Sequence, residues 1–174
     1  MPIGKMSEMV KGTLLGTLTG AGQVANLSVD VVRDAAVNAL KSARTIGGET
    51  GHLARDAVTG AIQAAGNVGG EAGNLVKNSV IGVIEGTGEV ATATTTMLHD
   101  VVVGAIRGSS DVGAELGSAG RNAVEGAIDV SKSAGVSAAD AASAVATGAI
   151  EAAYDVSDAA GDAVRNAATG TISG

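Results

Sequence analysis

The chain has 174 residues, with 11 Lys and Arg against 18 Asp and Glu, and its net charge is -7. It contains one Tyr, no Trp and no Phe, so the aromatic side chains that fill most globular cores are almost absent. The acidic balance disfavours nucleic acid and anionic lipid headgroups as partners, because both select clustered Lys and Arg, and the lack of cysteine excludes disulfides and thiolate metal sites.

The start of the chain resembles a signal peptide in one respect, because Lys5 and Lys11 precede an apolar run at residues 14–18. Glu8 is unusual in the basic region of such a peptide, and the segment is in phase with the repeat described next. We therefore expect no cleaved signal peptide. No apolar run approaches the roughly 18 residues needed to span a bilayer, so a cytoplasmic location is the default expectation.

A 22-residue unit recurs along the chain without insertions. Its clearest mark is Gly-Ala-Ile or a near copy, and the unit predicts a lead-in at residues 1–12 followed by one array of about eight units at residues 13–174. The glycine stands at Gly60, Gly82, Gly104, Gly126, Gly148 and Gly170, and earlier equivalents are Gly16 and Asn38.

Two aliphatic positions and one basic position repeat with the glycine. A large aliphatic residue follows it by two residues and another by eight, and a basic residue precedes it by five. The basic residues are Arg33, Arg55, Lys77, Arg121 and Arg165, with His99 and Ser143 in the two gaps.

The period predicts an all-α chain. Twenty-two is twice eleven, and eleven residues make three helical turns at about 3.67 residues per turn, which favours right-handed or nearly straight coiled-coil packing. Pro2 is the only proline, and the constant period indicates a long continuous helix or a few long helices. One unbroken helix would be on the order of 250 Å long.

Glycines spaced by four residues let helix backbones approach closely, so we expect packing against other copies of the chain to be the condition for folding. The basic residues are candidates for ion pairs between chains; they are Arg33, Arg55, Lys77, Arg121 and Arg165. The predicted helix-packing interface consists of Gly60, Ile62, Val68, Gly82, Ile84, Val90, Gly104, Ile106, Val112, Gly126, Ile128, Gly148 and Ile150.

Two other architectures fit the same period. One is a parallel β-solenoid, in which each unit forms one coil. The other is a set of antiparallel helical hairpins that turn at Gly47-Gly48 or Gly69-Gly70, since such dipeptides mark turns.

No motif in the sequence predicts an enzyme. The G-x-G-x-x-A pattern at residues 86–91 also occurs at residues 20–25, so the repeat generates it and we interpret it as structural. His52 and His99 occupy different positions of the repeat, which argues against a shared metal site. We therefore expect no catalytic residues, no cofactor, no metal and no small-molecule substrate.

The pattern of a basic residue, Asp or Asn, small residues and Gly-Ala-Ile resembles the hendecad coiled coils and, more distantly, late-embryogenesis-abundant proteins and apolipoproteins. The resemblance implies helices with an eleven-residue period and carries no functional residues. The first hypothesis is a structural protein that assembles with itself into bundles, sheaths or filaments. The alternatives are an amphipathic coat on a lipid or polymer-granule surface, which the charge does not favour, and a stress-protective chain.

Overall fold

The structure is a computed structural model that describes residues 29–44, 50–67 and 72–173, together with positions 8, 11, 12 and 16. Within these residues the regular structure is entirely α-helical, so the β-solenoid is not supported. Helices of 16 to 19 residues succeed one another: α2 (Val29–Arg44), α3 (Thr50–Asn67), α4 (Ala72–Val90), α5 (Thr95–Asp111), α6 (Leu116–Ser131), α7 (Ala138–Val156) and α8 (Asp158–Ser173).

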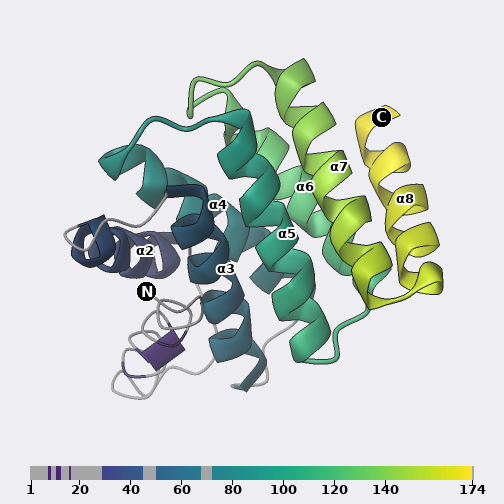
Figure 1. Cartoon of the computed structure of the whole chain (residues 1–174), viewed down its shortest axis with the longest axis horizontal. Coiled ribbons are helices and arrows are strands. Elements are labelled where there is room, and N and C mark those ends of the chain that lie inside the picture. Colours follow the sequence, from purple (N-terminus) through teal and green to yellow (C-terminus); the bar gives the residue numbers. More distant parts are fainter. Residues whose placement is uncertain are drawn as a thin grey trace.

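The helices form two layers. Helices α2, α4, α6 and α8 contact one another in that order, and α3, α5 and α7 do the same in the second layer (Figure 1). Across the layers, α3 contacts α4, and α6 contacts both α5 and α7. Helices α2 to α7 thus pack most extensively on a helix two places away, whereas α8 packs on α7 at least as extensively as on α6.

The expectation of one continuous rod is wrong, because turns interrupt the chain at regular places. Gly113 and Gly135 follow α5 and α6 with φ angles of +72° and +80°, a left-handed conformation that favours glycine and ends a helix. They lie 22 residues apart, which is the period that the sequence predicts. The expected turns at Gly47-Gly48 and Gly69-Gly70 lie outside the described residues.

Polar side chains begin helices α5 and α7. Thr94 Oγ1 accepts a hydrogen bond from the Met97 N–H at 3.2 Å, and Ser137 Oγ accepts one from the Asp140 N–H at 3.2 Å. The Ser137 hydroxyl also donates to the Asp140 carboxylate at 2.7 Å. These bonds satisfy N–H groups of the first turn that have no partner inside the helix.

The core between the layers consists of short aliphatic side chains. Ile84, Leu98 and Ile106 are its largest fully buried residues, and valines and alanines fill most of the remaining space. Because these side chains are small, the core holds together only if the helices lie close to one another. No helix among the described residues is long and apolar enough to cross a membrane.

The last two helices depart from the regular arrangement. Only Ser157 separates α7 from α8, and its hydroxyl accepts a hydrogen bond from the Ala160 N–H at 3.1 Å. Tyr154 packs against Gly161, and its hydroxyl donates to the Asp162 carboxylate at 2.7 Å. The single aromatic residue thus packs α8 against α7 and adds a hydrogen bond between them.

Glu115 begins α6 and provides a test of the capping interactions. Its two carboxylate oxygens each accept a backbone N–H at 2.7 Å, from Gly117 and Ser118. Hydrogen bonds from Ser118, and then from the Gly117 N–H, lower the pKa of the Glu115 carboxyl. We expect Glu115→Ala to reduce the free energy of unfolding at neutral pH by about 0.5–2 kcal/mol, measured by urea denaturation.

The pH dependence of this loss follows from the lowered pKa. The stabilisation by the charged cap is complete above the ordinary Glu pKa of about 4.3 and disappears as the pH falls through the lower value of the folded state. The difference between the wild-type chain and Glu115→Ala should therefore shrink in acid. Equal stability of the two proteins at neutral pH would contradict the assignment of Glu115 as a cap.

Candidate functional site

Three of the repeated glycines lie where helices of one layer touch. A methyl group added to any of them would lie 2.5 to 3.0 Å from a backbone carbonyl oxygen of the helix two places earlier, closer than side chains normally approach. Such contacts let Cα–H groups face carbonyl oxygens across the interface. The pairs are Gly104 with Arg55, Gly126 with Lys77 and Gly148 with His99.

These contacts lie within one chain, whereas the sequence predicted glycine packing between chains. Gly82 makes a similar approach to Val29 and Arg33, and Gly60 is also buried. The helices fold back on themselves, so a chain supplies its own neighbouring backbone at each glycine. Packing against a second chain is therefore not needed to bury these positions.

The repeated aliphatic residues contribute unequally to the packing. Those nearest the middle of the array are fully buried, and Ile128 and Ile150 are half-buried. Val112, the C-cap residue that follows α5, is 36% exposed, and its side chain packs against Gly66 of α3. Val68 and the side chain of Val90 lie outside the described residues. The fully buried members are Ile62, Ile84 and Ile106.

Two of the predicted basic residues pair with carboxylates on the helix two places later. Arg33 of α2 lies 3.8 Å from Glu85 and 3.5 Å from Glu89 of α4. Lys77 of α4 lies 2.7 Å from Asp129 of α6. His99, which takes the basic position in α5, lies 3.2 Å from Glu151 of α7. The offset is 52 residues for Arg33 with Glu85, Lys77 with Asp129 and His99 with Glu151.

The other three basic residues behave differently. Arg55 bonds to His52 Nδ1 at 2.6 Å on its own helix, and Arg165 lies 3.6 Å from Asp162, also on its own helix. Arg121 is exposed and forms no ion pair with a residue that the structure describes. Of the five candidates for pairs between chains, Arg33 and Lys77 are thus paired between helices of the same chain.

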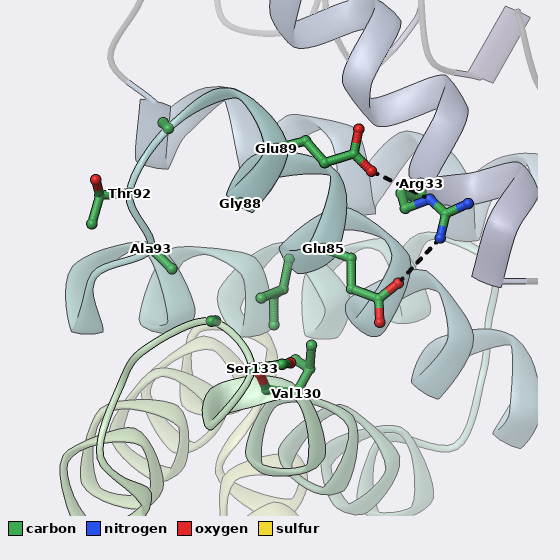
Figure 2. Close-up of a pocket in the computed structure, with 11 residues that line it drawn as sticks. Arg33, Glu85, Gly88, Glu89, Thr92, Ala93, Val130 and Ser133 are labelled. Atoms are coloured by element: carbon green, nitrogen blue, oxygen red, sulfur yellow. Dashed lines mark hydrogen bonds and ion pairs between the residues drawn. The ribbon is translucent and has the colours of Figure 1, made fainter.

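A surface cavity of about 420 Å³ lies beside the first of these pairs (Figure 2). Arg33 reaches from α2 to Glu85 and Glu89 on α4, while Val130 of α6 and Ser133 of the following turn lie on the opposite side. The guanidinium is shared by the two carboxylates, and the Ser133 hydroxyl donates to the Val130 carbonyl at 2.8 Å. These polar groups already have partners, so the arrangement serves mainly to hold α2 on α4.

The remaining sequence candidates lie on helices. Gly86 of the G-x-G-x-x-A pattern lies inside α4, where an added methyl would be 2.8 Å from the Arg33 carbonyl oxygen, so helix packing explains this glycine. His52 is on α3 and His99 on α5. Within the described residues, no three His, Cys, Asp or Glu side chains gather in a way that would hold a metal ion.

Sequence reasoning missed the helix caps and two buried serines. The Ser-Ala-Ala-Asp sequence at residues 137–140 is a known signal of a helix start and would have placed the beginning of α7. Ser79 and Ser109 are fully buried without a hydrogen-bond partner in the structure. The 22-residue spacing could have marked them, because Ser79 aligns with buried Ala57 and Val101, and Ser109 aligns with buried Thr87 and Ser131.

No protein-family model matches the chain, and no curated protein matches it. Among solved structures, the chain is similar to the crystal structure of the de novo designed helical repeat protein DHR7, with a TM-score of 0.60 and 18% sequence identity. The alignment covers 97% of this chain and 92% of that one. The likeness shows an α-helical repeat fold.

The glycine contacts predict that replacing glycine by alanine lowers the free energy of unfolding at one position and raises it at another. Gly104→Ala puts a methyl against the Arg55 carbonyl and the Val58 side chain, and we expect it to lower the free energy of unfolding by about 1–3 kcal/mol. Gly88 lies in α4, and no atom lies near a methyl group added there. Gly88→Ala should therefore raise the free energy of unfolding by about 0.4–1 kcal/mol. Urea denaturation measures both, and a Gly104→Ala protein as stable as wild type would contradict the packing.

The Lys77 pair predicts a stability loss at high pH. The hydrogen bond to Asp129 raises the pKa of the Lys77 ammonium. A raised pKa means that the stabilisation is complete below the ordinary Lys value of about 10.4 and is lost as the pH rises through the higher folded value. We expect Lys77→Met to cost less than about 1 kcal/mol at neutral pH, a difference that falls with added salt and vanishes in strong alkali.

The matched control is Lys132→Met. Lys132 is exposed and forms no ion pair with the described part of the chain, so its removal should leave the alkaline limb of the stability profile unchanged. Identical profiles for the two variants would show that the Lys77 pair contributes nothing.

Proposed function

We propose that this chain is a structural, non-enzymatic repeat protein that assembles with further copies of itself, and that one 22-residue unit corresponds to one helix with its turn. The helix starts, which lie 20 to 23 residues apart, support this correspondence. So does the glycine contact, which recurs from helix to helix along each layer.

The observation that carries the proposal is the exposure of one aliphatic side chain on each of the last two helices. Val156 of α7 is 44% exposed and Ile172 of α8 is 43% exposed. Exposed aliphatic residues favour association, since contact removes them from water.

The mode of assembly follows from the intrachain packing. The glycine contacts are used inside the chain, so assembly would add whole folded arrays rather than intertwine single helices as in a hendecad coiled coil. Repetition of one contact at a fixed rotation produces either a closed ring or an open filament. A fibrous product therefore requires only that repetition of the contact between arrays does not close into a ring.

Sedimentation velocity and negative-stain microscopy test the proposal. We expect the wild-type chain to form species larger than a monomer as its concentration rises, and Val156→Glu with Ile172→Glu to shift it to the monomer. Thr96→Glu adds a charge at an exposed position of α5 and should assemble as wild type does. A wild-type monomer at every concentration, or unchanged assembly of the double variant, would overturn the proposal.

The same samples separate the alternatives. Retention of the wild-type chain on lipid vesicles, without assembly in their absence, would favour the coat function. A monomer that is unfolded by circular dichroism until it is dried would favour the stress-protective function.

A further inference from the structure

A second cavity lies between the two layers near the end of α5. Its volume is about 230 Å³, and its described lining comes from α3, α4, α5 and the turn that follows α5. Ile62, Leu75, Val76 and Val112 supply aliphatic walls, and none of the described lining residues carries a charge. The cavity is separate from the exposed apolar residues of α7 and α8.

Ser109 supplies the only side-chain hydroxyl among the described lining residues. Its side chain is fully buried and makes no hydrogen bond. Other hydroxyls of the same fold bond to a carbonyl one turn earlier, as Thr87 does to Val83 at 2.7 Å. A buried hydroxyl without a partner is unfavourable, and such groups in folded proteins require an explanation.

One side of the cavity is accessible. Gly66, Val112 and Gly113 are exposed, whereas Ile62, Val76 and Ser109 are buried. The exposed residues therefore lie at the entrance and the serine lies at the inner end. A molecule in the cavity would therefore contact apolar walls on its outer side and the hydroxyl at its inner end.

We propose that this cavity binds a small, neutral, mainly apolar molecule that carries one hydrogen-bonding group, with that group paired to Ser109 Oγ. The size is suitable, because a cavity of roughly 150 Å³ in another protein accommodates benzene. A single ring with one polar substituent therefore fits. The absence of charge in the described lining disfavours ions, since an ion would lose its hydration without a compensating partner.

Phenol and toluene are the probes, because they have nearly the same shape and only phenol has a hydroxyl. Titrations followed by the methyl NMR signals of the chain give both affinities. We expect both to bind, with the shifts concentrated at Ile62, Val76 and Val112. Ser109→Ala should weaken phenol about two- to tenfold, the effect of one net hydrogen bond, and should leave toluene unweakened.

Ser79→Ala is the matched control. Ser79 is also a fully buried serine without a partner, but it does not line the cavity. The control should bind both probes as wild type does, and circular dichroism confirms that each variant is folded. Failure of the wild-type chain to bind either probe would overturn the proposal, as would equal loss of phenol affinity in the two variants. Sedimentation of the same proteins tests self-assembly separately, so failure of one proposal leaves the other standing.

Discussion

Close approach of helix backbones at glycine is the constraint on which the rest of the structure depends. A core made of Val, Ile and Ala buries little apolar area per residue, so its contacts become strong enough only when the helices lie near one another. Each interior glycine weakens its own helix by about 0.8–1 kcal/mol relative to Ala. The packing that it permits against the Arg55, Lys77 or His99 backbone offsets this loss. Helix formation and tertiary packing are therefore inseparable here.

The same repeated position couples backbone packing to charge. The Lys77 carbonyl oxygen packs against Gly126 of α6, and the Lys77 ammonium forms an ion pair with Asp129 one turn further along that helix. His99 does the same in the other layer, with its carbonyl at Gly148 and its ring at Glu151. Once the glycine fixes the crossing point, the acidic residue three positions later is already within reach. These polar contacts need little additional ordering of the side chains, so even a small contribution from each can add to the packing.

The sequence predicts helices and most of their packing residues, because steps of three and four among small apolar residues determine which side of a helix is buried. It did not predict how the helices connect. A constant period fits both a continuous rod and short helices with turns of constant length, and the glycines at positions 113 and 135 fall in the same place in each unit. The partners of the basic residues also depend on how the helices connect, so the sequence did not predict them. The Ser109 cavity depends on how α3, α4 and α5 are placed relative to one another. The periodicity of the sequence does not predict that placement.

In α8 the repeated glycine contact is replaced by a different one. The equivalent glycine in α8, Gly170, has no atom near an added methyl, so the regular crossing is missing there. Val164 of α8 packs instead on Gly120 of α6, with the glycine now on the earlier helix. Only Ser157 separates α8 from α7, and α8 packs on α7 as well as on α6. A helix that loses the regular crossing leaves its aliphatic residue uncovered, which explains why Ile172 is exposed while Ile84 and Ile106 are buried.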